Sequence, residues 1–292
     1  MAVRAMKKYF ITYGDERFAR SRDRLCRQAS KFGFFDVVRG FTGKSLSSLS
    51  EWRKAQKLDE FKRVIGRSTH AWWAWKPAII YYMLSEIMSD NDVLFYSDGG
   101  STLPTWNQGS KPKEVAGGYR GMPQYKHGKE FAPHSLEHSL LKFSQYTEMI
   151  NSAPNSCIAF PLHSIVNDKP ILEKYWTKPD VFDHFKVKNN KSIRDTLQRA
   201  GGMLHAARKS PFTLRLYKEW WLTAKHHPSL FSDETSYPDF FKKGLFHRHD
   251  QSVWSILSKI HGSIEADPEE EFMCPILTTR YNTADKIHNT PY

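Results

Sequence analysis

Short β-type runs and helix-type stripes of apolar residues alternate along the first hundred positions. Residues 9–13 favour a strand, and the helical stripe that follows predicts a helix. Residues 34–41 predict a second strand, and residues 45–61 a polar, mostly helical segment. The clearest helix is expected over residues 72–88, where Pro77 suits the first turn. Its buried face would hold Ile79, Ile80, Met83, Leu84 and Ile87.

The apolar run 93–96 then predicts a central strand buried on both faces. Residues 101–131 are rich in Gly, Pro and Lys without periodicity, which indicates a long surface loop or lid. Later segments favour helices over 134–150, from Ser210-Pro211 and from Asp250, and strands over 157–162 and 201–207. Residues 165–195 and the tail after Asp267 are expected to be irregular.

The alternation of strands and helices predicts an α/β fold with a mixed, mainly parallel central sheet flanked by helices. The chain has 292 residues, of which 40% are hydrophobic, enough for a sizeable core. It has no internal repeat, heptad or long linker, so we expect a single domain over 1–292. Its two halves would be residues 9–100 and 132–292, separated by the 101–131 loop.

The formal net charge of +12 favours partners that carry phosphate or other negative charge. The basic residues are spread along the chain and no nucleic-acid-binding motif is present, so we do not expect nucleic acid as a partner.

Three well-separated cysteines indicate a reducing compartment. The absence of an apolar signal segment or membrane-spanning run predicts a cytoplasmic protein, with peripheral membrane contact still allowed. The oligomeric state is left open.

The central strand ends in Ser97, Asp98, Gly99 and Gly100. Ligand crevices of open α/β sheets lie beyond the carboxyl ends of the strands, so Asp98 is a candidate ligand for Mn²⁺ or Mg²⁺ holding a diphosphate. The glycines would let the backbone approach a ligand closely. The alternative is an ordinary turn after a strand.

Asp250 follows His249 at the start of a predicted helix and precedes Gln251. It is either a helix N-cap or a carboxylate that deprotonates an attacking hydroxyl, and one residue could do both. Gln251 could hydrogen-bond a substrate hydroxyl. Gly201 and Gly202 favour either a bulge or a close backbone approach to a substrate.

Cations and aromatic residues mix before the clearest helix. Arg67 and Lys76 could bind phosphate, whereas Trp72, Trp73 and Trp75 are as well explained by core packing. In the irregular tail, Arg280 is a further cation and His288 a candidate metal ligand.

The ordered segments TYGDE, GFFDVV, GRSTHAWWAWKP, DVLFYSDGG, QRAGGMLHAARKSP and HRHDQSVWSIL resemble a group of glycosyltransferases with the GT-A fold. This group occurs in bacteria and large DNA viruses, including the chlorella-virus enzymes that decorate capsid glycans. If the protein is viral, the expected compartment is the host cytoplasm. The resemblance covers about residues 9–260.

This resemblance implies a Rossmann-like nucleotide-binding half over residues 9–100 and an acceptor-binding half with the tail over residues 132–292. It also implies a nucleotide-sugar donor such as a UDP-sugar, and a glycan or glycoprotein acceptor. A Mn²⁺ or Mg²⁺ ion would bind Asp98 in the place of the family's Asp-x-Asp motif, although Gly99 and Gly100 leave that motif incomplete. Asp250, with His249 and Gln251, would lie at the reacting centre. The donor would lie against Thr12, Tyr13, Gly14, Arg67, Lys76, Ser97, Gly99, Gly201, Gly202 and Arg280.

An inverting mechanism with Asp250 as base is favoured, and a retaining one stays open. UDP-xylose, UDP-glucose and UDP-galactose are all candidate donors, and rhamnose remains open as the transferred sugar. A non-catalytic protein that binds nucleotides or carbohydrates on the same scaffold is the alternative. A basic nucleic-acid-binding protein would fit less well.

Overall fold

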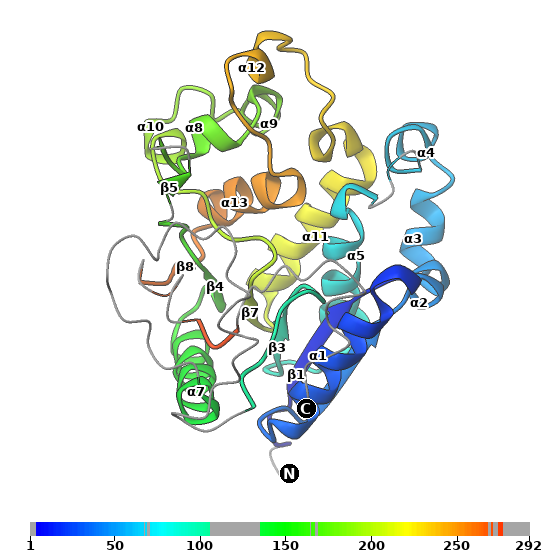
Figure 1. The fold of residues 1–292 in the computed structure, drawn as a ribbon, viewed down its shortest axis with the longest axis vertical. Helices are drawn as coiled ribbons and strands as arrows, with labels where there is room; N and C mark the ends of the chain where they lie inside the picture. The colour runs from blue at the N-terminus through cyan, green and yellow to red at the C-terminus, as the bar shows by residue number, and fades with distance from the viewer. Residues whose placement is uncertain are drawn as a thin grey trace.

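The computed structural model describes residues 4–66, 68, 71–105, 135–163, 165–166, 169–267, 270 and 274–276. A six-stranded sheet in the order β2-β1-β3-β7-β4-β8 forms its centre (Figure 1). The strands are β1 (Lys8–Tyr13), β2 (Val37–Phe41), β3 (Val93–Tyr96), β4 (Cys157–Ala159), β7 (His205–Arg208) and β8 (Ile264–Glu265). Five strands run in one direction and β7 runs against them. The predicted mixed, mainly parallel α/β sheet flanked by helices is therefore confirmed.

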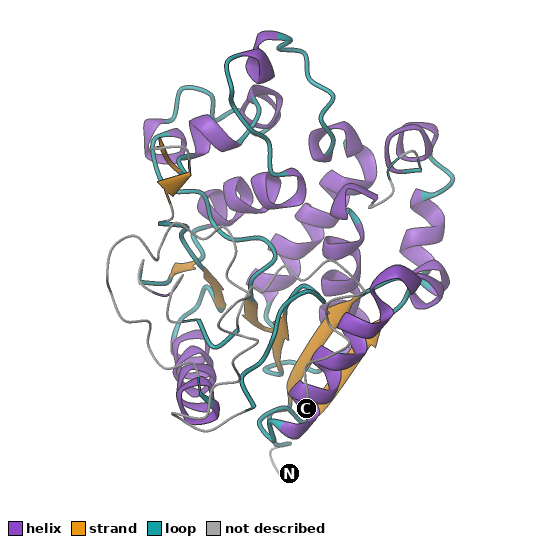
Figure 2. Ribbon diagram, viewed as in Figure 1, coloured by secondary structure: helices purple, strands orange, loops and turns teal. Residues whose placement is uncertain are grey.

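Helices cover both faces of this sheet (Figure 2). Side chains alternate along each strand, so Leu94 and Tyr96 of β3 face one core cluster and Val93 and Phe95 the other. The first cluster contains α5 (Trp75–Tyr82), α11 (Pro211–His226) and α13 (His249–His261). The second contains α1 (Ala19–Lys31) and α7 (Leu136–Ser152).

Shorter elements complete the described chain. Before β3 these are η1 (Glu16–Phe18), α2 (Gly43–Ser48), α3 (Ser50–Ala55), α4 (Asp59–Ile65), η2 (Ala71–Trp73) and η3 (Met83–Ile87). After α7 they are α8 (Glu173–Trp176), α9 (Pro179–His184), α10 (Lys191–Arg194), η5 (Pro228–Phe231), α12 (Asp239–Lys242) and the hairpin of β5 (Ile165–Val166) with β6 (Lys169–Pro170). The segment 165–195, expected to be irregular, is thus built of this hairpin and three short helices.

The prediction of a single helix over residues 72–88 is wrong at both its start and its end. It starts later, because residues 71–73 form a left-handed turn and α5 begins at Trp75. It also ends in a π-helical turn over Met83–Ile87, and Ile87 is 39% exposed instead of buried. A π turn contains one extra residue, which rotates the following side chains away from the expected face.

Residues 106–134, which include most of the expected loop or lid, lie outside the described residues. Most of the tail after Asp267 does so too. Among the residues that are described, no helix has the length and apolar character needed to cross a membrane.

Candidate active site

The ends of three strands gather the predicted residues at one edge of the sheet. β1 and β3 are parallel, so their carboxyl ends lie together, and the antiparallel β7 begins at the same edge. The chain leaving β3 is tied to the chain entering β7. The Asp98 amide donates to the Gly202 carbonyl at 3.0 Å, and the Ser97 hydroxyl donates to the Met203 carbonyl at 2.7 Å. This is the edge at which open α/β sheets bind ligands.

A buried lysine joins the two candidate carboxylates. Lys76 is the second residue of α5, and its side chain is only 2% exposed. Its Nζ lies 2.6 Å from Oδ2 of Asp250 and 3.3 Å from Oδ1 of Asp98, and it donates to the Gly201 carbonyl at 2.7 Å. The ammonium group thus has one hydrogen-bond partner, the Gly201 carbonyl, and two ion-pair partners, the carboxylates. A phosphate on Lys76, as the sequence suggests, would have to exchange with one of them.

The opposite charges of Lys76, Asp98 and Asp250 stabilise each other's ionised forms. Burial lowers the pKa of Lys76, but the adjacent Asp250 and Asp98 carboxylates outweigh burial and leave that pKa raised, so the ammonium stays protonated. Burial raises the pKa of Asp250 to about 6, against the opposing effect of Lys76. Asp250 is 7% exposed at its side chain and Asp98 37%. Asp250 is therefore a mainly ionised, desolvated carboxylate, and Asp98 is the more accessible carboxylate of the two.

The structure does not make Asp250 a helix N-cap. Arg248 occupies the N-cap position of α13 without a side-chain capping bond, and Asp250 is the second helical residue. Its carboxylate turns to Lys76 instead. The N-cap alternative is wrong because the ion pair, not the helix end, determines where this side chain points.

Two further side chains at the site were not found from the sequence. The Tyr96 hydroxyl donates to Oδ1 of Asp98, and a ring nitrogen of His205 lies 3.0 Å from the Gly201 carbonyl. Burial lowers the pKa of His205 to about 3, so this ring is neutral. Both residues face the same side of paired strands, where they register opposite each other. The alternation of side chains along β3 and β7 is the signal that could have identified them.

Gly201 and Gly202 leave no room for a side chain. A Cβ at Gly201 would lie 2.7 Å from the Gln251 Cα, and one at Gly202 would lie 2.0 Å from Oδ2 of Asp98. The Gln251 side chain accepts from the Gly201 amide at 3.2 Å and donates to Gln198 at 2.7 Å. Gln251 thus positions the Gly201 backbone, and the two glycines let that backbone approach the acidic residues closely.

We expect Gly202→Ala to remove most activity while costing about 1–3 kcal/mol of unfolding free energy. The new methyl group would push the Asp98 carboxylate off its present position, which lies within reach of Lys76 and Tyr96. Activity assays and denaturant unfolding measure the two effects. Gly43→Ala is a matched control, because a Cβ there meets nothing within 4 Å. A fully active Gly202→Ala would show that the position of Asp98 is unimportant.

A strained turn leads into the site from the side of α5. Ala71, Trp72 and Trp73 all have left-handed φ angles, of 48°, 46° and 58°, and His249 has a φ of 51°. Each such residue other than glycine costs about 1–2 kcal/mol. Strain of this kind persists where surrounding contacts enforce it, and it concentrates at functional sites.

The turn brings two indoles onto one imidazole. The ring centroids of Trp72 and His249 are 4.8 Å apart, and those of Trp73 and His249 are 5.2 Å apart and stacked. Nδ1 of His249 lies 2.9 Å from the Phe231 carbonyl, and burial lowers the pKa of this histidine. His249 is therefore held as a neutral ring in an aromatic contact, beside the ion pair of Asp250.

The predicted nucleotide-binding residues of β1 lie at the same sheet edge. Tyr13 stacks on Trp75 with 4.1 Å between ring centroids. The buried Thr12 hydroxyl has no hydrogen-bond partner within the described residues. A Cβ at Gly99 would lie 2.7 Å from the Tyr13 carbonyl, and one at Gly14 would lie 2.9 Å from the Phe18 carbonyl. Close packing of the loops thus accounts for both glycines.

Arg67, Arg280 and His288 lie outside the described residues, so their predicted roles stay predictions. Within the described part of the chain, no three His, Cys, Asp or Glu side chains group as a metal site. Asp98 still fits a divalent cation as a single ligand. Its Oδ2 accepts no hydrogen bond from the described residues, and Mg²⁺ is often held by one carboxylate with phosphate and water.

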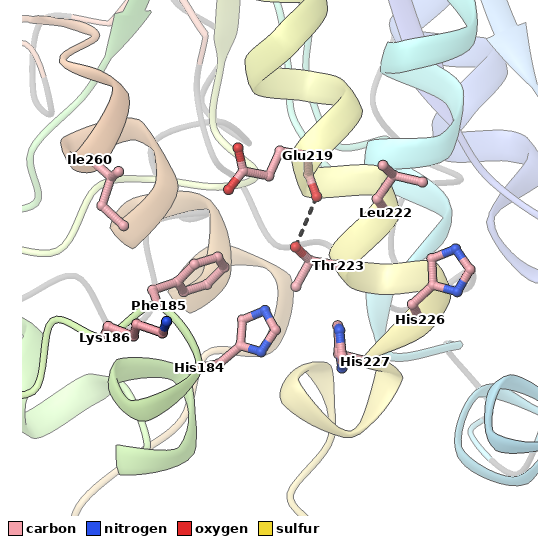
Figure 3. Close-up of a pocket in the computed structure, with 9 residues that line it drawn as sticks. All are labelled: His184, Phe185, Lys186, Glu219, Leu222, Thr223, His226, His227 and Ile260. Atoms are coloured by element: carbon pink, nitrogen blue, oxygen red, sulfur yellow. Dashed lines mark hydrogen bonds between the residues drawn. The ribbon is translucent and has the colours of Figure 1, made fainter.

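A separate pocket of about 500 Å³ lies at the far ends of α11 and α13 (Figure 3). Ile260 in its wall is ten residues beyond Asp250 on α13, or about 15 Å along the helix. None of the predicted site residues lines it. Its lining comprises His184, Phe185, Lys186, Glu219, Leu222, Thr223, His226, His227 and Ile260.

Comparison with known proteins identifies a distant structural neighbour. No family model and no curated protein matches the sequence. Among solved structures, the apo form of mouse xyloside xylosyltransferase 1 aligns with a TM-score of 0.38 and 12% sequence identity. The alignment covers 89% of this chain and 84% of the mouse protein.

Proposed function

We propose that this protein is a glycosyltransferase that moves a sugar from a nucleotide-sugar donor, such as a UDP-sugar, to a hydroxyl of a glycan acceptor. One observation carries the proposal. Two carboxylates of unequal exposure share the buried Lys76 at the ligand-binding edge of the sheet. The resemblance of the ordered sequence segments to glycosyltransferases of the GT-A fold points to the same chemistry.

In this proposal Asp250 is the general base. It takes the proton of the acceptor hydroxyl as the acceptor oxygen attacks the anomeric carbon of the donor sugar, and the bond from that carbon to the diphosphate breaks. Lys76 holds Asp250 ionised and in place, with the Gly201 carbonyl as its third partner. A single displacement of this kind inverts the anomeric configuration.

Asp98 is the residue proposed to hold Mn²⁺ or Mg²⁺ at the diphosphate. When bound, such an ion would stabilise the negative charge of the departing nucleoside diphosphate. Tyr96 and Lys76 fix Oδ1 of Asp98, and this leaves Oδ2 as the oxygen available to a ligand. The side chain is 37% exposed, so ligands can reach it.

A donor screen tests the proposal. Thermal shift is measured with UDP-, GDP- and TDP-sugars, each with Mn²⁺ and with EDTA, and release of the nucleoside diphosphate is then assayed with a mixture of methyl glycosides as acceptors. We expect stabilisation and turnover with one nucleotide family. The absence of both with every donor at millimolar concentration would contradict a transferase.

The pH dependence of turnover follows from the same base. Burial raises the pKa of Asp250 to about 6, and only the ionised carboxylate can accept a proton. We therefore expect the turnover rate to rise about tenfold per pH unit below pH 6 and to level off above it. Initial rates from pH 4.5 to 8 measure this, with melting curves at each pH as the control. A rate independent of pH between 4.5 and 7 would exclude Asp250 as the base.

A further inference from the structure

We propose that the aromatic surface formed by Trp72, Trp73 and His249 binds the sugar ring of the acceptor, beside the base. This inference rests on the proposed function and names the substrate group that this part of the site takes. The ring centroids of Trp72 and Trp73 lie 4.8 Å and 5.2 Å from that of His249. We call these three rings the aromatic surface.

The residues of the aromatic surface are close in sequence to both Lys76 and Asp250, which form an ion pair at the site. His249 is the residue before Asp250, and Trp73 is three residues before Lys76. Because His249 and Asp250 are consecutive residues at the start of α13, the aromatic surface begins one residue along the chain from the proposed base. The group that gives its proton to Asp250 must lie beside that residue, and in a transferase this group is the acceptor.

The backbone is strained in order to hold these rings where they are. Trp72, Trp73 and His249 all have left-handed φ angles and are only half-buried. The fully buried Trp220 and Trp254, by contrast, lie in ordinary helices. Trp72 and Trp73 pack partly against the core, and together with His249 they combine a strained backbone with rings that remain partly accessible, as expected of a binding surface.

The next part of this segment, Trp75, contacts the end of β1 instead of α13. Trp75 is buried and stacks on Tyr13 at the end of β1. Residues 71–76 thus extend from the β1 end, through Lys76, to the start of α13. The β1 and β3 ends are the proposed donor side, whereas the aromatic surface contacts the start of α13, the helix that carries Asp250.

The chemistry of the aromatic surface suits a saccharide. Indole faces pack against the C–H face of a sugar ring, and the His249 ring that supports the two indoles is neutral, so it adds no charge that binding would have to desolvate. The Asp250 carboxylate, the residue after His249, supplies an acceptor for the attacking sugar hydroxyl.

Kinetics of Trp73→Ala test the inference. With the methyl glycosides of glucose, galactose, xylose and rhamnose as acceptors, we expect the acceptor KM to rise at least tenfold. The donor KM and the donor hydrolysis rate without acceptor should stay within about twofold of the wild type, because the donor side is untouched. Trp73→Phe, which keeps a flat ring, should restore most of the affinity. Phe241→Ala, which alters a 37% exposed ring on α12, is the matched control and should change neither KM.

Two results would overturn the inference. One is an unchanged acceptor KM in Trp73→Ala, with or without a higher donor KM; a higher donor KM would make the aromatic surface a nucleobase platform. The other is an equal effect of Trp73→Ala and Phe241→Ala. If the wild type turns over no nucleotide sugar, the proposed function fails separately. Saturation-transfer NMR with the same glycosides then decides: binding lost in Trp73→Ala supports a saccharide site, and no binding to the wild type refutes it.

Discussion

Replacing Lys76 by Met is expected to abolish sugar transfer and to lower the free energy of unfolding by about 3–5 kcal/mol. Met keeps the length of the side chain but removes the charge. Asp250 would then be a buried carboxylate without its partner at 2.6 Å, and the Gly201 carbonyl would lose its donor at 2.7 Å. The pKa of Asp250, already raised to about 6 by burial, would rise further, so the base would be protonated at neutral pH.

Lys259→Met is the matched control for this experiment. Lys259 is also buried and pairs with a buried carboxylate, Glu173, at 2.7 Å, but it lies in the last turn of α13, away from the site. We expect a comparable loss of stability in Lys259→Met with turnover retained by the folded protein. Chemical denaturation and activity assays on the folded fraction separate the two effects.

The double variant Lys76→Met with Asp250→Asn sharpens the test. Removing both charges leaves no uncompensated buried ion, so much of the lost stability should return while activity stays absent. If Lys76→Met alone were as stable and as active as the wild type, the central ion cluster would have no role in either property.

The positions of the longer strands along the chain follow well from the sequence, because each buried run is short, apolar and bounded by turn residues. The run 93–96 is observed as β3 at the same bounds, and the Asp98 that follows it lies at the predicted sheet edge. The parallel β1–β3 core is a local consequence of alternating strands and helices.

The left-handed turn at residues 71–73 could not be predicted in the same way. Trp72 and Trp73 carry an apolar pattern that fits the start of a helix, and periodicity does not report φ angles. Their conformation depends on His249, more than 170 residues later in the chain, whose ring they contact. Tertiary contacts of this kind are invisible to a window of neighbouring residues.

At the candidate site, too, local sequence indicates the single residues but not their tertiary contacts. The sequence indicates Asp98, Asp250 and Lys76 separately, each from its local setting. Both carboxylates pair with the ammonium group of Lys76, although Asp98 and Asp250 follow Lys76 by 22 and 174 residues in the sequence. Residue type and position can therefore nominate the charged groups, but only the folded chain, in which Lys76 of α5 reaches both carboxylates, pairs them.

Asp250→Asn is expected to lower kcat by about 10²–10⁴-fold while the protein stays folded. The amide cannot take a proton from the acceptor hydroxyl, but its oxygen can still accept a hydrogen bond from Lys76, now 2.6 Å from the carboxylate. The cost in unfolding free energy should be about 1–2 kcal/mol, less than in Lys76→Met, because Lys76 keeps Asp98 as a counter-charge. Both KM values should change little.

The stereochemistry of the product decides how this loss is read. If Asp250 is the base of a single displacement, the wild-type product has the anomeric configuration opposite to that of the donor sugar, which proton NMR of the fresh product shows directly. Asp239→Asn, which alters an exposed carboxylate on α12, is the control and should leave kcat unchanged. A retained configuration, or an Asp250→Asn variant with wild-type kcat, would remove Asp250 from the role of base. In the first case the buried carboxylate beside Lys76 would have to act by stabilising positive charge on the sugar ring instead.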